Sequence, residues 1–455
     1  MLDWRKLFLG GFLLQEVRFG TDGIRDIVNK GLTASVAFDA GCALALSLKE
    51  TVSKPQVVIG HDTRKSADML INAFSSGLMS YGVDVVDLGL VSTPAVSYIT
   101  EKSNADAGVM ITASHNTSEY NGIKIFNQNG GKVGMQSEGV LEKYAKSLNK
   151  YELCDSEEVG VKSEDFKALN GYLSFLRKKL KKNELKVAFD CANGVTNIIV
   201  PKVFKKINTT ILGDSTVSCM VNKGNGVMDI KKLQTTVVSE GLDVGFAFDG
   251  DGDRIYAVDE KGKVLDGDDI LGVIALYALS KRKLKNNTVV GTVMTNCGIE
   301  GSLKLYGIKL IRQNVGDRFI QGEMRKNGYV LGGEQSGHII IGDKLNTGDG
   351  VLTAITILNI MRETRKRLSE LTEPLRRFPS ELINVAVREE SKNYILTSVD
   401  LQDFIRDLEQ ELGCKGRILV RASGTESKIR ILVEGEDKKL IKSIAETLKF
   451  KILSM

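Results

Sequence analysis

The chain has 455 residues, of which 42% are hydrophobic and 26% charged, and its formal net charge is +5. This length exceeds what one hydrophobic core supports, so three or four domains of a globular protein are expected. The positive charge is modest and spread along the chain, which favours small anionic substrates and argues against a nucleic-acid partner. The six cysteines include no CxxC pair, which excludes a standard zinc cluster and gives no sign of a disulfide framework. Reduced thiols in a cytoplasmic protein are therefore expected.

Residues 1–16 are interpreted as an N-terminal extension. Arg5 and Lys6 precede an apolar run, Leu7–Leu14, and no A-x-A cleavage site follows before Glu16. Eight apolar residues are too few to span a bilayer, and no later stretch approaches a transmembrane helix. We therefore expect no membrane partner, and an upstream start codon is one explanation for the extension.

Residues 17–155 are predicted to form a first α/β domain, which opens with the glycine-rich polar loop RFGTDGIR. Strands that alternate with helices are typical of a parallel sheet covered on both faces. The polar stretch near Asn149–Lys162 indicates where this domain ends. The predicted elements are strands at Gln56–Ile59, Val83–Leu88 and Ala107–Thr112 and a helix at Ala67–Tyr81.

The strand at Ala107–Thr112 runs into a loop that contains Ser114 and His115. Ligands of α/β folds bind at the carboxyl ends of strands, so a hydroxyl here could carry a phosphoryl group. Lys124, which follows the loop, could hold phosphate or move protons. The alternative is that Ser114 merely caps the next helix. In extended backbone Ser114 and His115 would face opposite ways, which argues against a hydrolase triad.

The same pattern returns in two further predicted domains, residues 156–258 and 259–368. The charged segment Lys366–Pro379 predicts a linker to a last domain, residues 369–455, whose strands and helices suggest a small α+β fold. Strands of the middle domains are predicted at Leu185–Asp190, Asp243–Phe248, Thr288–Val293, Ile308–Arg312 and Tyr329–Leu331, with a helix at Thr347–Ile360.

The segment DGDGDR, residues 249–254, is the most specific motif. In extended backbone Asp249, Asp251 and Asp253 would point the same way and their carboxylates would converge. Converging carboxylates repel one another unless a cation lies among them, and hard oxygen ligands suit Mg²⁺. The spacing also matches an EF-hand, but Arg254 stands where that loop needs glycine, and a strand precedes the motif. A solvated acidic turn without metal is the other interpretation.

Two later loops also contain residues suited to catalysis or to substrate binding. RASGTESK, residues 421–428, combines arginine, hydroxyls and glycine between strands, a composition that cradles phosphate. A polar hairpin turn is the alternative. GEQSGH, residues 333–338, offers Glu334 and Ser336 for sugar hydroxyls, with His338 as an acid/base group or phosphate partner. A histidine in a loop is, however, more often merely hydrogen-bonded.

Taken in order, TASHN with NGIKIF, DGDGDR, GEQSGH and RASGTESKIR resemble the α-D-phosphohexomutase superfamily, from about Val17 to the C-terminus. RFGTDGIRD, CANG, VGDRF and GEQSGH resemble its bacterial phosphoglucosamine mutase branch, with Gln335 where the phosphomannomutase/phosphoglucomutase branch more often has methionine. The resemblance implies three related α/β domains with mixed, mainly parallel sheets. It also implies a C-terminal α+β domain of the TATA-binding-protein-like type, and one central cleft.

The resemblance further implies a phosphoserine enzyme that interconverts glucosamine 6-phosphate and glucosamine 1-phosphate through a 1,6-bisphosphate, with a hexose or hexosamine 1,6-bisphosphate as activator. Ser114 is then the phosphorylated nucleophile, and one Mg²⁺ is held by Ser114, Asp249, Asp251 and Asp253. Lys124, His338 and Arg254 become acid/base or phosphate-positioning candidates. The residues implied for substrate binding are Arg25, Glu334, Ser336, Arg421, Ser423, Gly424, Thr425 and Arg430.

The chain departs from the family pattern at His61, where a lysine or arginine is usual, and at Thr117 and Ser427, where proline is usual. His61 makes a fixed positive charge near Ser114 titratable. The alternatives are a phosphoglucomutase or phosphomannomutase on the same fold, a catalytically silent sugar-phosphate-binding protein, and a phosphatase with an aspartate nucleophile. The sequence leaves the oligomeric state open, a homodimer included.

Overall fold

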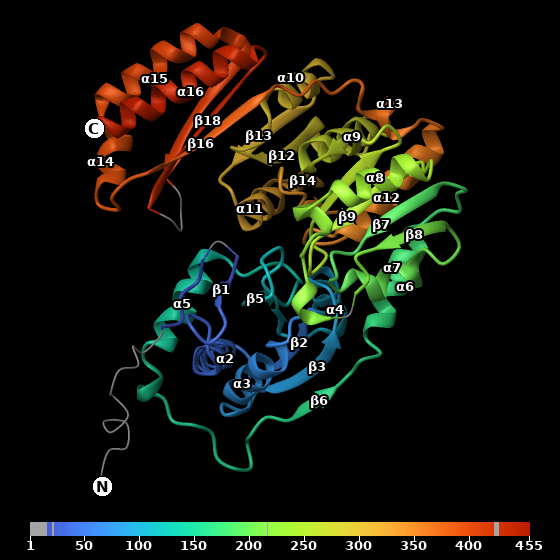
Figure 1. The fold of residues 1–455 in the computed structure, drawn as a ribbon. Coiled ribbons are helices and arrows are strands. Elements are labelled where there is room, and N and C mark those ends of the chain that lie inside the picture. The colour runs from blue at the N-terminus through green and yellow to red at the C-terminus, as the bar shows by residue number, and fades with distance from the viewer. Residues whose placement is uncertain (1–15, 21, 216, 423–426) are drawn as a thin grey trace.

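The structure is a computed structural model that describes residues 16–455 except 21, 216 and 423–426. The expected N-terminal extension therefore lies almost wholly outside the described residues. Four sheets follow one another along the chain, each with its own helices, and the four units form an arc from the blue unit to the red one (Figure 1). Within the described residues, no helix is both long and apolar enough to cross a membrane.

The first unit is a six-stranded sheet in the order β1-β5-β4-β2-β3-β6. Strands β4, β2, β3 and β6 are parallel, and β5 and β1 add an antiparallel edge. Every residue of β4 is buried, as expected of a central parallel strand. The bounds are β1 (Ile24–Ile27), α2 (Ala34–Lys49), β2 (Gln56–His61), α3 (Ala67–Met79), β3 (Asp84–Leu90), α4 (Thr93–Ser103), β4 (Ala107–Ile111), β5 (Tyr120–Asn127), α5 (Met135–Ala145) and β6 (Lys162–Glu164).

The second unit repeats this plan with five strands in the order β11-β10-β9-β7-β8. Its parallel strands β9, β7 and β8 carry an antiparallel edge formed by β10 and β11. The bounds are α6 (Leu169–Lys179), β7 (Lys186–Asp190), α7 (Thr196–Val203), β8 (Asn208–Leu212), α8 (Lys231–Ser239), β9 (Val244–Phe248), β10 (Ile255–Asp259) and β11 (Val264–Leu265).

The third unit has four strands in the order β13-β12-β14-β15, and only β15 is antiparallel to its neighbour. The first three sheets are thus mixed and mainly parallel, which confirms the expected fold class. The bounds are α9 (Gly267–Ser280), β12 (Thr288–Thr292), α10 (Cys297–Leu305), β13 (Lys309–Gln313), α11 (Asp317–Asn327), β14 (Leu331–Gly333), β15 (Ile339–Ile341), α12 (Gly350–Thr364) and α13 (Leu368–Thr372).

The fourth unit is an antiparallel sheet in the order β16-β18-β17, covered by α15 and α16, and it confirms the C-terminal α+β domain. Its hydrophobic core, which includes Ile431 and Leu448, is separate from the large core of the other units. Polar contacts join it to the third unit, where Arg417 donates to the carbonyls of Val293 and Thr295 at 2.8 Å each. The bounds are β16 (Ser380–Ala386), α14 (Ser391–Thr397), α15 (Val399–Leu412), β17 (Gly416–Ala422), β18 (Lys428–Gly435) and α16 (Lys438–Leu453).

Candidate active site

Ser114 lies in the loop between β4 and β5 and is fully buried. Its φ of 51° is left-handed, a conformation that non-glycine residues rarely adopt, so the expectation of extended backbone at this position is wrong. The Ser114 hydroxyl donates a hydrogen bond of 2.6 Å to Asp249 Oδ2 in the second unit. Because β5 and not a helix follows the loop, the helix-capping alternative is also wrong. The serine is thus presented to the acidic motif of another domain.

The carboxylates of Asp249, Asp251 and Asp253 do converge, with one potential ligand atom from each lying within 4.8 Å of the others. They converge through a turn between β9 and β10 and not through extended backbone, because Gly252 adopts a φ of 75°. All three side chains are buried, and Oδ1 of Asp251 and of Asp253 has no hydrogen-bond partner among the described residues. Burial and the two neighbouring carboxylates raise the pKa of Asp249 well above its usual range. Orphaned oxygens and mutual repulsion fit a divalent cation at this position.

Glycine lets the serine loop and the acidic loop approach each other closely. A Cβ on Gly250 would lie 2.8 Å from the Ser114 carbonyl oxygen, closer than real Cβ atoms come to neighbouring atoms. Gly250 is therefore required by contact with the first domain, whereas Gly252 is required by the positive φ of the turn.

Lys124, on β5, is buried beside three carboxylates. Its Nζ donates to Asp251 Oδ2 and to Asp253 Oδ2, both at 2.8 Å, and lies 3.4 Å from Asp22 Oδ2. Burial lowers the pKa of Lys124, but the three carboxylates outweigh it and raise that pKa well above its usual value. With these partners Lys124 is a fixed cation, suited to holding carboxylates and phosphate.

Arg64, in the HDTR loop after β2, holds the backbone of the serine loop. Its buried guanidinium donates to the carbonyl oxygens of Ser114 at 3.0 Å and Asn116 at 2.7 Å, and also to those of Thr117 and Tyr120. Asn222 of the second unit donates to the same two carbonyls, of Ser114 and Asn116, at 2.7 and 2.9 Å. The loop that carries the serine is therefore clamped from two domains.

Arg64 and Asn222 are functional candidates that the sequence motifs did not predict. A signal for Arg64 existed, because HDTR follows β2, and β2 and β4 are parallel neighbours whose carboxyl ends meet at one edge of the sheet. For Asn222 no signal existed, since it lies in a loop of the second unit far from any motif.

Replacing Arg64 with lysine is expected to lower kcat by roughly 10- to 100-fold, because a single ammonium cannot hold four carbonyls in the geometry of a planar guanidinium. Steady-state kinetics measure the effect. The matched control is Lys65→Met, which removes the neighbouring, exposed cation and should leave kcat unchanged. A kcat of Arg64→Lys equal to that of the wild type would contradict a positioning role.

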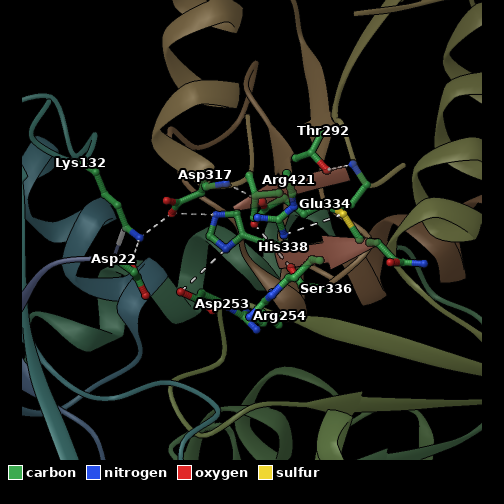
Figure 2. A pocket seen from close by; sticks show the side chains of 15 residues that line it. Asp22, Lys132, Asp253, Arg254, Thr292, Asp317, Glu334, Ser336, His338 and Arg421 are labelled. Atoms are coloured by element: carbon green, nitrogen blue, oxygen red, sulfur yellow. Dashed lines mark hydrogen bonds and ion pairs between the residues drawn. The ribbon is translucent and has the colours of Figure 1, made fainter. Parts of the chain in front are cut away.

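A cavity of about 250 Å³ opens beside the acidic motif, and all four units contribute to its walls (Figure 2). Ser114 and Lys124 are buried and do not line it, whereas Asp253 belongs both to the acidic motif and to the wall. The side chains that face the cavity with polar groups are Asp22, Lys132, Asp253, Arg254, Thr292, Asp317, Glu334, Gln335, Ser336, His338, Arg421 and Arg430.

The GEQSGH loop follows β14, as expected, and brings its three candidate residues into the cavity wall. Glu334 is held from two sides, since its Oε1 accepts from the Gly316 N–H at 2.9 Å and its Oε2 lies 3.5 Å from Ser336 Oγ. His338 Nε2 accepts from the Gly348 N–H at 3.0 Å, so in the neutral ring the proton is on Nδ1, 3.8 Å from Asp253 Oδ2. Burial lowers the pKa of His338, and Asp253 and Asp317 more than offset this and raise it.

The described part of the phosphate loop places two arginines in the cavity wall. Arg421 on β17 and Arg430 on β18 are directly opposite each other in the antiparallel register. Like charges in such a pair repel, and burial together with Arg430 lowers the pKa of Arg421. An anion between them would relieve the repulsion. Ser423, Gly424 and Thr425, the other candidates in this loop, lie outside the described residues.

The remaining two candidate arginines differ in position. Arg254 lines the cavity, and its backbone N–H donates to Asp249 Oδ1 at 3.1 Å. Burial lowers the pKa of Arg254, but the surrounding carboxylates, Asp249 first among them, raise it. Arg25 lies at the edge of the serine loop, where its side chain donates to Asn116 Oδ1 at 3.0 Å and pairs with Asp22, and it does not line the cavity.

Family models match almost the whole chain in four consecutive parts. They describe the phosphoglucomutase/phosphomannomutase α/β/α domains I, II and III, at residues 16–152, 166–262 and 266–378, and the C-terminal domain, at residues 382–449. A curated relative from Caldanaerobacter subterraneus, named phosphoglucosamine mutase, is 44% identical over 434 residues, which cover 94% of this chain and 97% of the relative.

Solved structures share the fold at lower identity. A phosphoglucomutase/phosphomannomutase family protein from Burkholderia thailandensis superposes with a TM-score of 0.80 at 22% identity, covering 97% of this chain and 98% of the other. The N-acetylphosphoglucosamine mutase of Aspergillus fumigatus, solved with GlcNAc-6P and magnesium, superposes with a TM-score of 0.62 at 19% identity, covering 90% and 85%. These matches confirm the resemblance drawn from the motifs. The chain belongs to the phosphoglucomutase/phosphomannomutase family, within the α-D-phosphohexomutases.

Proposed function

We propose that this enzyme is a phosphoglucosamine mutase, which interconverts glucosamine 6-phosphate and glucosamine 1-phosphate through a phosphoserine at Ser114 and a 1,6-bisphosphate intermediate. The observation that carries the site assignment is the 2.6 Å hydrogen bond from Ser114 to Asp249, which joins a buried serine to three converging carboxylates beside the cavity. The relative at 44% identity over nearly the full chain supports the amino-sugar substrate.

Asp249, Asp251 and Asp253 would hold one Mg²⁺ together with the phosphate on Ser114. The orphaned Oδ1 atoms of Asp251 and Asp253 and the mutual repulsion of the three carboxylates support this assignment. Bound Mg²⁺ would offset the charge of the phosphoserine and polarise its phosphorus. The magnesium present in the Aspergillus structure supports the choice of metal.

The proposed reaction consists of two phosphoryl transfers, one from Ser114 to the sugar and one back to Ser114. The sugar 1-hydroxyl oxygen attacks the phosphorus on Ser114, the bond between phosphorus and Ser114 Oγ breaks, and the 1,6-bisphosphate forms. The bisphosphate then turns over, and its 6-phosphoryl group returns to Ser114. Lys124 and Arg254 supply positive charge next to the reacting phosphate, and His338 is placed to move a proton.

The binding roles are divided between the third and fourth domains. Glu334 and Ser336 would receive sugar hydroxyls, since both line the cavity and the Gly316 amide fixes the glutamate. Arg421 and Arg430, with Ser423, Gly424 and Thr425 of the same loop, would clamp the phosphate that is not reacting. Arg25 would steady the serine loop through Asn116 and hold substrate at its edge. A clamp on the last domain, which has its own core, can open and close over the cavity.

Initial rates on glucosamine 1-phosphate, glucose 1-phosphate and mannose 1-phosphate, with Mg²⁺ and the matching bisphosphate, test the substrate. We expect the amino sugar to react at least roughly tenfold faster, because an ammonium group allows charge pairing that a hydroxyl does not. Equal or better rates on glucose or mannose phosphate would move the chain to the phosphoglucomutase/phosphomannomutase branch. The absence of turnover on all three substrates would favour a catalytically inactive protein that binds sugar phosphates.

The remaining expectations belong to the same proposal. A hexose or hexosamine 1,6-bisphosphate is the proposed activator, because it returns phosphate to an unphosphorylated Ser114. We propose a cytoplasmic enzyme whose partners are small phosphosugars, with neither nucleic acid nor membrane, and with a homodimer as one oligomeric state to test. An aspartate phosphatase would leave Ser114 and the arginine pair without a role.

A further inference from the structure

The VGDRF motif, Val315–Phe319, resembles the phosphoglucosamine mutase branch, and the proposed mechanism uses only its Gly316 amide, which holds Glu334. In the structure it joins β13 to α11, and Val315, Gly316 and Asp317 line the cavity. Arg318 points to the first domain, where it pairs with Glu138 at 2.5 Å. The motif therefore combines a contact between domains with one carboxylate that faces the cavity.

The Asp317 carboxylate lies in the middle of a polar cluster (Figure 2). Its Oδ2 pairs with Lys132 Nζ at 2.5 Å and lies 3.4 Å from His338 Nε2, while its Oδ1 accepts from the Arg318 N–H at 2.9 Å. The side chain is 8% exposed, so it borders the cavity without being open to bulk water. A charge so placed acts strongly on whatever group occupies the cavity next to it.

Four carboxylates line the cavity among the residues that the structure describes, and three have other partners or roles. Asp253 belongs to the proposed metal site, and Glu334 is proposed to receive hydroxyls. Asp22 is shared by Arg25, Lys132 and Lys124. Asp317 shares Lys132 with Asp22 but has no role in the proposed metal site or in holding hydroxyls. It adjoins Glu334, because the amide of the preceding residue, Gly316, donates to Glu334 Oε1 at 2.9 Å.

We propose that Asp317 is the specificity-determining residue for the amino sugar, with its carboxylate pairing with the 2-ammonium group of the substrate. This inference rests on the proposed function. Glu334 would hold hydroxyls of the same ring, so the adjacent carboxylate is placed toward a neighbouring ring carbon. The sugar turns over between the two half-reactions, and the ammonium meets Asp317 in one of its two orientations.

A charged pair at this position discriminates between sugars in a way that hydrogen bonds to hydroxyls cannot. A glucose phosphate offers Asp317 a neutral hydroxyl, whereas a glucosamine phosphate offers a cation, and hydrogen bonds between charged groups are about twice as strong as neutral ones. Lys132 bridges Asp22 and Asp317 and keeps the carboxylate compensated before the substrate arrives.

The test compares the ratio of kcat/KM for glucosamine 1-phosphate to kcat/KM for glucose 1-phosphate in the wild type and in Asp317→Asn. We expect the ratio to fall at least roughly tenfold, because asparagine keeps the shape and removes the charge. Asp317→Glu should retain more of the ratio than Asp317→Asn. The matched control is Glu138→Gln, which breaks the neighbouring pair with Arg318 but removes no charge from the cavity, and its ratio should equal that of the wild type.

Two results would overturn the inference. In the first, the wild type prefers the amino sugar, but Asp317→Asn has the same ratio of kcat/KM values as the wild type. In the second, the ratio falls as far in Glu138→Gln as it does in Asp317→Asn. If Asp317→Asn does not fold, Asp317→Ser, which also suits the first turn of a helix, takes its place with the same expected fall. A wild type without a preference for the amino sugar would instead contradict the proposed substrate. Failure of the proposed substrate and failure of the role of Asp317 therefore give different results.

Discussion

Replacing Ser114 with alanine is expected to abolish mutase turnover, with a loss of at least roughly 10⁴-fold in kcat, because the phosphoryl group then has no oxygen to return to. The proposed cycle has no route around this step, since the bisphosphate forms and collapses only by exchange with Ser114. Initial rates with glucosamine 1-phosphate, Mg²⁺ and the bisphosphate measure the loss. Intact mass should at the same time show phosphate on the wild-type chain and none on the variant.

The fold of Ser114→Ala should survive, which separates chemistry from stability. The hydroxyl donates a hydrogen bond to Asp249, and alanine is no more strained than serine at a φ of 51°. Arg64 and Asn222 hold the loop through main-chain carbonyls, which the variant keeps. We expect thermal unfolding and Mg²⁺ binding close to those of the wild type. Retention of full mutase activity by a correctly folded variant would contradict the phosphoserine mechanism. It would favour a mechanism in which an aspartate accepts the phosphoryl group.

Much of the fold could be predicted because buried strands and amphipathic helices leave a periodic trace in the sequence. The predicted strands at Gln56–Ile59, Leu185–Asp190 and Ile308–Arg312 correspond to β2, β7 and β13 within two residues at each end. The strand predicted at Tyr329–Leu331 instead begins at Leu331 as β14. There two glycines pair with β12 and β15, and glycine carries no hydrophobic signal.

The residues that line the site were predicted where a motif concentrates unusual side chains, as in DGDGDR and GEQSGH. Local sequence could not reveal contacts that depend on how distant elements pack. Arg64 binds four carbonyls 50 or more positions away, and carbonyls carry no sequence identity. The same holds for the bridge from Lys132 to Asp22 and Asp317, which exists only because the first and third domains meet.

The carboxylates of DGDGDR converge as predicted, but through a turn and not through the extended backbone on which the prediction was based. Alternation in an extended chain and a tight turn with glycine both bring the three carboxylates to one point, so the sequence predicts the cluster without distinguishing the two. The turn has a further consequence, because it places the glycine at position 250 against the Ser114 carbonyl. The approach of the two loops therefore depends on the turn.

Replacing Asp251 with asparagine is expected to weaken Mg²⁺ binding at least about tenfold, or about 1.4 kcal/mol, and to lower kcat by roughly 100-fold. Asp251 is fully buried, and its Oδ2 accepts from Thr93 Oγ1 at 2.5 Å and from Lys124 Nζ at 2.8 Å. Within the part of the chain that the structure describes, its Oδ1 has no partner. Asparagine keeps the shape but removes the charge that draws the cation. Lys124 keeps Asp253 and Asp22 as partners, so the buried ammonium is not stranded and the fold should persist.

Calorimetric titration of the metal-free protein with Mg²⁺ measures the affinity directly, and the metal dependence of the initial rate should move to higher Mg²⁺ in parallel. Asp229→Asn is the matched control, because it removes an exposed carboxylate from the same domain and should bind Mg²⁺ like the wild type. Unchanged affinity in Asp251→Asn would show that its orphaned oxygen is not a ligand, and the cation would then have to be held by Asp249, Asp253 and the phosphoserine. A loss of affinity with the kcat at saturating Mg²⁺ restored would instead limit Asp251 to holding the metal. A kcat that stays low at saturation is what we expect, because the carboxylate also orients Lys124 and Thr93 through hydrogen bonds.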